Sequence, residues 1–183
     1  MKKQPRSLAD VTIRSERLIL RPITLDDARD VFIEFNDNVT KMMAHGPNES
    51  LEATSEFIEK TIQQTREGEK LQFVIVDKEE KFLGLASIED ANHRTPEIGL
   101  WLKKAAQGKG FGTELVFALV EWANQNLEFD YIKYRVHAQN VGSWKIAEKL
   151  IEKYGGEFIG ETPEILQGVE RMTKVYHIFP ENS

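Results

Sequence analysis

The residue pattern with the clearest chemical meaning is a glycine-rich loop from Gln107 to Thr113, which has the sequence Gln-Gly-Lys-Gly-Phe-Gly-Thr. It lies between a predicted strand, Glu97 to Leu102, and a predicted helix, Phe111 to Asn124. Three glycines at alternate positions leave backbone amides uncovered at the start of that helix, where unpaired N–H groups and the helix dipole attract phosphate oxygens. From Ile98 to Thr113 the sequence has three lysines and no acidic residue, although the formal net charge of the chain is −6. The loop therefore predicts a pocket for a polyanion.

The same glycines could also form a tight connector without a ligand, because isolated glycine motifs often carry no function. A P-loop is excluded because Lys109 is followed by Gly110 instead of Ser or Thr. A dinucleotide-binding fingerprint needs a glycine where Thr113 stands, and an acidic residue at the end of the second strand, whereas Asp130 precedes the next predicted strand. A nucleotide-binding protein that uses the loop in another way stays open as a rival function.

The composition is that of a soluble globular protein, with 183 residues, 30% charged and 40% hydrophobic. The length fits one domain, predicted over residues 11–179, preceded by a flexible N-terminus over residues 1–10. The absence of cysteine excludes disulfides and a cysteine nucleophile, and the four histidines lack the spacing of a helical metal site, so no metal is expected. With no apolar run of ~18 residues and no secretory signal, we expect a cytoplasmic protein without a membrane partner. The acidic balance argues against nucleic-acid binding.

Hydrophobic periodicity predicts seven strands and four helices in the order β-α-α-β-β-β-α-β-α-β-β. The strands are expected at residues 12–21, 72–76, 82–89, 97–102, 131–137, 158–161 and 170–179, and the helices at 24–35, 51–66, 111–124 and 143–154. Residues 36–50 are predicted to form a loop. This order predicts a mixed α/β domain with helices on both faces of a central mixed sheet. The strands before and after helix 111–124 should be parallel, joined by a right-handed crossover.

Four segments together resemble the GNAT superfamily of N-acyltransferases, and in particular its RimJ/RimL-like branch of ribosomal-protein N-terminal acetyltransferases. The glycine loop is similar to the Gln-x-x-Gly-x-Gly loop that binds the acyl-CoA pyrophosphate in this family. Residues 15–22 (SERLILRP) resemble the first strand of that branch, residues 96–102 (PEIGLWL) its central strand, and residues 140–143 (NVGS) its Asn-x-x-Ser motif. The segments follow the order of the family and cover residues 10–178. The resemblance implies a GNAT-like single domain and an acetyl-CoA-dependent N-acetyltransferase.

The resemblance also implies which residues hold acetyl-CoA. Backbone amides of the glycine loop would bind the pyrophosphate, which assigns that role to Gln107, Gly108, Lys109, Gly110, Phe111, Gly112 and Thr113. Backbone groups of Leu100, Trp101 and Leu102 would run beside the pantetheine arm, where the central strand of the family splays from the next one. An amide near Leu102 would then polarise the thioester carbonyl. The carboxamide of Asn140 would bond the pantetheine amides, and an ordinary helix-start Asn is the alternative for this residue.

Ser143 and Glu97 are the candidate catalytic residues. By resemblance, Ser143 faces the CoA sulfur and protonates the leaving thiolate, while a helix cap is its alternative role. Many family members use a tyrosine seven residues after the Asn, where this chain has Ala147, and Tyr154 is a second candidate acid. Glu97 begins the central strand and could take the proton of the attacking amine, directly or through water. The alternative for Glu97 is a solvated surface carboxylate.

The expected acceptor is a primary amine, either a protein N-terminus or a small polyamine-like or drug-like molecule. Residues 39–50 and 161–168 are candidate acceptor-side segments. Residues 152–158 are longer than the short Gly-Phe of the family, so the acceptor cannot be transferred from any relative. The main rival function is a non-catalytic acyl-CoA-binding sensor or scaffold on the same fold. A homodimer is one option for the assembly.

Overall fold

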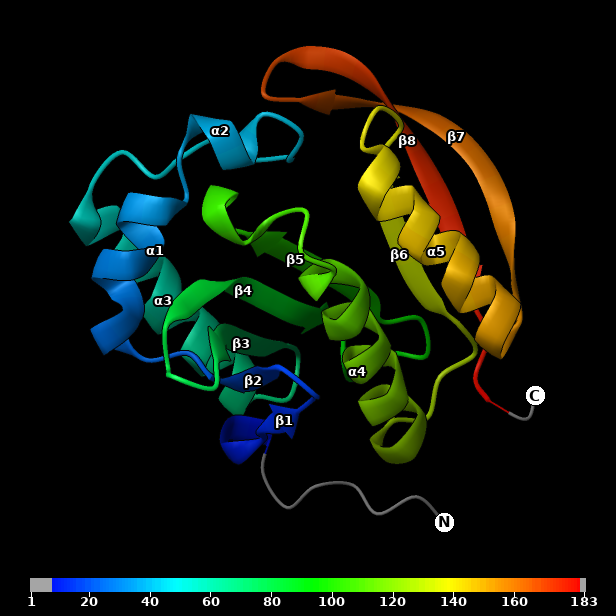
Figure 1. Ribbon diagram of the computed structural model, residues 1–183, viewed down its shortest axis with the longest axis horizontal. Helices are drawn as coiled ribbons and strands as arrows, with labels where there is room; N and C mark the ends of the chain where they lie inside the picture. Colours follow the sequence, from blue (N-terminus) through cyan, green and yellow to red (C-terminus); the bar gives the residue numbers. More distant parts are fainter. Residues whose placement is uncertain (1–7, 182–183) are drawn as a thin grey trace.

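The computed structural model describes residues 8–181 as eight strands and five α-helices built around one sheet (Figure 1). The strands are β1 (Ile13–Arg14), β2 (Leu18–Pro22), β3 (Leu71–Asp77), β4 (Phe82–Glu89), β5 (Glu97–Leu102), β6 (Ile132–His137), β7 (Gly156–Leu166) and β8 (Val169–Ile178). The helices are α1 (Ala28–Glu34), α2 (Asp37–Thr40), α3 (Leu51–Arg66), α4 (Phe111–Asn126) and α5 (Val141–Tyr154). Of the N-terminus expected to be flexible, residues 1–7 lie outside the described residues, and Leu8–Asp10 form a 3₁₀ turn.

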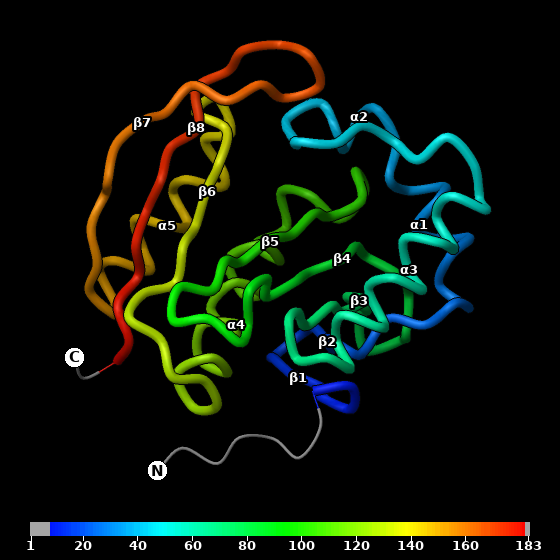
Figure 2. The backbone as a smooth tube through the Cα atoms, turned by 180° about the vertical axis from the view of Figure 1, so that it is seen from behind, coloured from blue at the N-terminus to red at the C-terminus, as the bar shows by residue number. Residues whose placement is uncertain are grey.

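The sheet has the strand order β1-β2-β3-β4-β5-β6-β8-β7, and its neighbouring strands are antiparallel except for β5 and β6. These two strands flank α4 in the sequence, so the predicted parallel pair is confirmed. Among the described residues, β5 and β6 pair only at Glu97 and Lys133. Beyond that point they diverge toward their carboxyl ends, as both views of the backbone show (Figures 1 and 2).

Helices cover both faces of the sheet, as the sequence predicted (Figure 1). On one face, α1 and α3 contribute Val31 and Ile58 to a small core with residues of β3 and β4. On the other face, α4 and α5 contribute Leu115 and Leu150 to the larger core. An apolar core therefore covers each face of the sheet, and β5 and β6 diverge within the sheet, between the two cores.

Strand β5 presents different chemistry to its two faces because successive side chains of a strand alternate in direction. Ile98 is buried in the larger core, and Leu100 and Leu102 pack against that core. Trp101 packs against the smaller core under α1 and α3. By the same alternation, Glu97 and Gly99 share the face of Trp101. This face of β5 therefore carries a carboxylate, a bare backbone and an aromatic ring in succession.

Three local features differ from the sequence prediction. The first strand is interrupted by a turn in which the Ser15 amide donates to the Leu18 carbonyl (2.9 Å), so β1 and β2 form a small hairpin. Residues 36–50 contain the short helix α2, whose cap Asn36 accepts a side-chain hydrogen bond from the Asn38 amide. Strand β7 is much longer than the predicted residues 158–161, because it pairs with β8 from Gly156, directly after the α5 C-cap Gly155, through to Leu166.

Candidate functional site

The glycine loop and the start of α4 line a cavity of about 590 Å³. Gly108 and Gly110 have φ angles of 75° and 79°, a conformation that favours glycine, and Gly110 is the N-cap of α4. The first amides of the helix have no partner within the helix, so they can serve an anion in the cavity. Lys41 and Lys104 also line it. The predicted cofactor-binding residues found in its lining are Leu100, Trp101, Leu102, Gln107, Gly108, Gly110, Gly112, Thr113 and Asn140.

Arg17 and Glu114 hold the glycine loop from outside the cavity. Glu114 lies in the first turn of α4 and accepts hydrogen bonds from Ser15 Oγ (2.7 Å), the Arg17 amide (2.6 Å) and Arg17 Nε (2.7 Å). Burial by itself would raise the pKa of the Glu114 carboxyl, but these hydrogen bonds and the charge of Arg17 outweigh it and lower that pKa. Arg17 Nη1 also donates to the Lys109 carbonyl (3.0 Å), and its guanidinium lies 4.6 Å from the centre of the Phe111 ring. Lys109 and Phe111 are thus engaged by Arg17, and neither lines the cavity.

The open edge of β5 faces the gap left by β6. The Lys103 amide bonds to the Leu83 carbonyl of the strand before it, so Lys103 and Leu83 form a hydrogen-bonded pair. Because such pairs alternate along antiparallel strands, the amides of Leu100 and Leu102 point away from β4 and toward the gap. Gln107 ties the glycine loop to this strand end, since its Nε2 donates to the Leu102 carbonyl (3.0 Å). A ligand beside β5 could therefore pair with backbone amides as an added strand would.

A second cavity of about 260 Å³ adjoins the first where β5 and β6 diverge. The two cavities share Met42, Met43, Leu100, Asn140 and Ser143. Glu97 of β5 and Tyr134 of β6 line the second cavity but not the first. The structure thus brings the candidate acid, Ser143, and the candidate base, Glu97, to the walls of one cavity.

Asn140 and Ser143 occupy the start of α5. Asn140 is the N-cap, and its Oδ1 accepts a hydrogen bond from the Ser143 amide (3.2 Å). The helix-start role considered for Asn140 is therefore confirmed, and the cap role considered for Ser143 is wrong. Tyr154, the second candidate acid, lies at the far end of the same helix and lines neither cavity.

The hydroxyl of Ser143 pairs with a buried tyrosine. Its Oγ lies 2.9 Å from the hydroxyl oxygen of Tyr134, a residue that is 1% exposed. Burial raises the pKa of Tyr134 to about 12, and the bond to Ser143 offsets only part of this effect. The phenol is therefore protonated at neutral pH and can donate a hydrogen bond to Ser143.

Glu97 stands at one end of a chain of ion pairs across the second cavity. Arg135 Nε donates to Glu97 Oε1 (2.9 Å), and Arg135 Nη1 donates to Glu164 Oε1 (3.0 Å). Glu164 Oε2 in turn accepts a hydrogen bond from Thr173 Oγ1 (3.1 Å). The side chain of Glu97 is 19% exposed. A freely solvated carboxylate, the alternative considered for Glu97, is therefore wrong, because the residue is paired and largely covered.

The two segments expected on the acceptor side meet in the structure. Gln167, in the turn between β7 and β8, donates from Nε2 to the carbonyls of Thr40 (2.7 Å) and Met43 (3.0 Å). In Figures 1 and 2 this turn arches toward the segment that follows α2. Met43 lines the first two cavities and a third one of about 300 Å³. Gln167 therefore anchors a segment that forms part of the wall of all three cavities.

Five residues of the site were not singled out from the sequence: Arg17, Glu114, Tyr134, Arg135 and Gln167. Two of them lay in segments that the sequence analysis had noted, Arg17 in the motif of residues 15–22 and Gln167 in the acceptor-side segment of residues 161–168. Tyr134 and Arg135 lie in a correctly predicted strand, yet the sequence does not say what they face.

Among residues 8–181 there is no cluster of three or more His, Cys, Asp and Glu that could hold a metal ion. Over the same residues no helix combines the length and the apolar character that crossing a membrane requires.

Comparison with known proteins identifies the family. The family model for the acetyltransferase (GNAT) domain matches residues 17–150, so the chain belongs to the GNAT family, and it is an acetyltransferase. The "Uncharacterized N-acetyltransferase p20" of Bacillus licheniformis is 31% identical over 145 residues, which cover 76% of this chain and 80% of that protein.

Two solved structures illustrate the same fold. Spermidine N-acetyltransferase from Vibrio cholerae, in complex with CoA and spermine, has a TM-score of 0.76 at 23% identity, covering 89% of this chain and 95% of that one. The acetyltransferase from Salmonella typhimurium that modifies the N-terminal serine of ribosomal protein L7/L12 has a TM-score of 0.77 at 16% identity, covering 92% and 99%. At these identities the similarity establishes the fold alone.

Proposed function

We propose that the protein transfers an acetyl group from acetyl-CoA to a primary amine by direct attack in a ternary complex. The observation that carries this proposal is the pair of adjoining cavities, which join the glycine loop to both candidate proton-transfer residues. In the larger cavity, the amides at the start of α4 and the charges of Lys41 and Lys104 suit the pyrophosphate of CoA. The free amides of β5 suit the pantetheine arm.

Glu97 is the proposed base for the incoming ammonium. Among the described residues its ion pair uses Oε1, which leaves Oε2 for the amine or for a bridging water. The deprotonated nitrogen attacks the thioester carbonyl carbon, a C–N bond forms, and the C–S bond breaks. In this proposal the Leu102 amide, on the open edge of β5, donates to the carbonyl oxygen as negative charge develops there.

Ser143 is the proposed proton donor to the departing thiolate. Its hydroxyl lines the wall between the two cavities and is bonded to the Tyr134 hydroxyl. When Ser143 gives its proton to sulfur, Tyr134 can hand its own proton to Ser143, and solvent restores it. Tyr134 acts here through Ser143 and is a positioning residue.

The acceptor belongs, in this proposal, to the amines of the RimJ/RimL-like branch, which are protein N-termini or small molecules. Support comes from residues 15–22 and 140–143, which resemble motifs of that branch, and from the shared fold with a ribosomal-protein acetyltransferase and a spermidine acetyltransferase. The acidic pair Glu97 and Glu164 beside the second cavity suits a cationic acceptor.

Acetyl-CoA mixed with a panel of small amines and N-terminal peptides tests the proposal by release of free thiol. We expect thiol release that saturates with the amine. Glu97→Gln should slow this release, and Gly110→Asp should reduce it because CoA binding is weaker. Binding of CoA in calorimetry without turnover of any amine would instead indicate the acyl-CoA sensor. A melting temperature raised by ATP and not by CoA would indicate the nucleotide-binding rival.

A further inference from the structure

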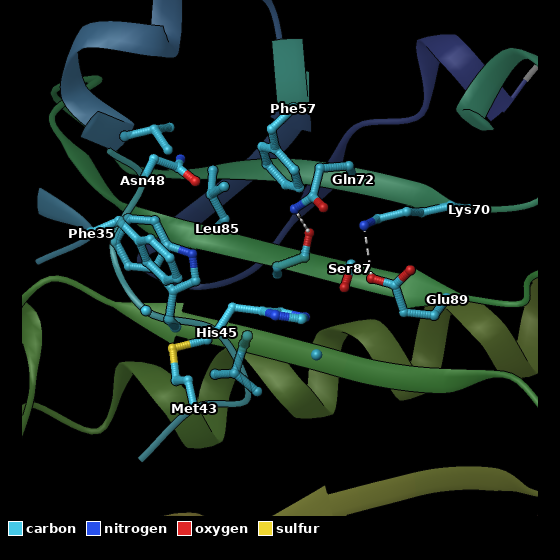
Figure 3. A pocket seen from close by; sticks show the side chains of 16 residues that line it. Phe35, Met43, His45, Asn48, Phe57, Lys70, Gln72, Leu85, Ser87 and Glu89 are labelled. Carbon is cyan, nitrogen blue, oxygen red and sulfur yellow. Dashed lines mark hydrogen bonds and ion pairs between the residues drawn. The ribbon is translucent and has the colours of Figure 1, made fainter. Parts of the chain in front are cut away.

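The third cavity, of about 300 Å³, lies on the face of the sheet that α1 and α3 cover (Figure 3). Its floor is formed by β3, β4 and β5, and its walls by Phe35, Phe57 and the segment from Met43 to Asn48. It shares Met43, Gly99 and Leu100 with the cavity that holds Glu97. The third cavity therefore adjoins the cavity that Glu97 lines.

The pairing of β4 with β5 places the floor residues in three rows, each made of one residue from either strand. Leu85 pairs with Trp101, Ser87 with Gly99, and Glu89 with Glu97. Residues two apart on one face of a strand are separated by about 6.8 Å. Over roughly 14 Å, the floor thus changes from apolar, through small and polar, to acidic.

The apolar end of the cavity is aromatic. The Phe35 ring lies 5.0 Å from the Trp101 ring, between centroids, and both line the cavity with Leu85. Figure 3 shows Phe35 at one end of the cavity and Lys70 and Glu89 at the other. This end provides a place for one compact apolar group, because rings pack favourably against each other at such distances.

The other end is polar and charged. Lys70 Nζ lies 2.9 Å from Glu89 in the third cavity, and in the adjoining cavity Arg135 lies between Glu97 and Glu164, with Arg171 Nη1 3.4 Å from His137. These charges are largely paired with one another. The atom that suits an ammonium group is Glu97 Oε2, because the ion pair with Arg135 uses Oε1.

Gly99 lies between the two ends of the floor and lines both cavities. A Cβ built on Gly99 would lie 3.0 Å from Ser87 Oγ, closer than ordinary packing allows. A side chain at this position would also take up space beside both cavities. The bare backbone of Gly99 is therefore the candidate passage from the aromatic end to Glu97.

We infer that the acceptor is a primary amine that carries one compact aromatic or branched aliphatic group on a linker that spans the row of Ser87 and Gly99. The inference rests on the proposed function and names the acceptor class of the same site. The apolar group packs among Leu85, Phe35 and Trp101, and the ammonium passes over Gly99 to Glu97. A linear polyamine would place a second cation over the apolar row, where the floor residues that the structure describes are Leu85 and Trp101 and desolvation is costly.

Calorimetry with the CoA-loaded protein tests the acceptor class, and it needs no turnover. We expect 4-phenylbutylamine to bind at least tenfold more tightly than spermidine, and also at least tenfold more tightly than 4-phenylbutan-1-ol, which lacks the amine. Equal or tighter binding of spermidine overturns the inference.

Thiol release from acetyl-CoA with the same amines tests the proposed function separately. Selective binding without thiol release supports the cavity assignment and contradicts catalysis, whereas thiol release with spermidine alone supports catalysis and contradicts the acceptor class.

Substitutions at the two ends of the path separate ligand contact from loss of folding. Phe35→Ala should weaken binding of 4-phenylbutylamine at least tenfold while leaving binding of ethylamine unchanged. Gly99→Ala should weaken binding of 4-phenylbutylamine at least tenfold and lower the melting temperature. Adding Ser87→Ala removes the close contact and should restore the melting temperature but not the amine affinity. If the double variant regains the affinity, Gly99 serves only to pack against Ser87, and the passage assignment is overturned.

Discussion

Ser143→Ala is the substitution for which the structure predicts two separate effects. The serine hydroxyl is both the proposed proton donor to the thiolate and the hydrogen-bond partner of the buried Tyr134 hydroxyl (2.9 Å). Removing it should slow turnover and should also leave the Tyr134 hydroxyl unpaired in a buried position. Loss of a helix cap is not expected, because Asn140 caps α5 and bonds to the Ser143 backbone, which alanine retains.

The two effects have different sizes. A buried donor left unsatisfied costs about 1–3 kcal/mol, and for a domain of this size about 2 kcal/mol lowers the melting temperature by roughly 4–8 °C. The effect on kcat should be a loss of about tenfold to a hundredfold, because a thiol with a pKa of about 8.5 by analogy with cysteine needs only modest help to leave. CoA affinity should change little, since Asn140 and the loop amides remain.

Tyr134→Phe provides the matched control. In the double variant with Ser143→Ala both partners of the hydrogen bond are gone, and such paired replacement is often nearly neutral. We therefore expect the double variant to regain most of the lost melting temperature and none of the lost kcat. Differential scanning calorimetry and thiol release on the same preparations measure both quantities. A Ser143→Ala variant with full kcat refutes the catalytic role, and a melting temperature that Tyr134→Phe does not restore refutes the role assigned to the hydrogen bond.

Four further outcomes follow from the site. Gly110→Asp strains the N-cap of α4, where φ is 79°, and puts a negative charge beside the proposed phosphate site, next to Arg17. It should weaken CoA binding at least tenfold in calorimetry, about 1.4 kcal/mol, and unchanged affinity in a folded variant would contradict the phosphate site. Arg17→Ala removes the hydrogen bond to the Lys109 carbonyl, so it should weaken CoA binding several-fold and lower the melting temperature. A lower melting temperature with unchanged CoA affinity would mean that the glycine loop keeps its shape without Arg17. Glu97→Gln should lower kcat by roughly 10²-fold with CoA affinity intact, and a pH–rate profile identical to the parent's would return Glu97 to a structural role. Burial, aided by the charge of Arg171, lowers the pKa of His137 in the folded protein. The unfolded chain therefore binds more protons than the folded one below a pH of about 6.5, so the free energy of unfolding should fall as the pH decreases from there. His137→Gln should flatten that fall in denaturant titrations.

Local patterns predicted the elements that build the cavities. The glycine loop, the helix that follows it and the parallel pair around that helix were all expected from short stretches of sequence, and the structure has them. Boundaries were less accurate where the local signal was weak. The short helix α2 and the long strand β7 depend on one cap residue and on pairing with β8, and neither shows in hydrophobic periodicity.

The sequence by itself determined the family, the fold class and most of the residues around the larger cavity, because these depend on motifs and on periodicities of two or 3.6 residues along the chain. Only the tertiary structure decided three contacts. Arg17 binds Glu114, 97 residues away in the sequence, and Gln167 donates to the Thr40 carbonyl, 127 residues away. The Tyr134 hydroxyl bonds to the Ser143 hydroxyl. Contacts of this kind arise when sheet register and helix packing bring distant segments together. No local pattern records which two side chains then meet, and this is why the proposed acceptor cavity, with its three rows on neighbouring strands, became visible only in the folded chain.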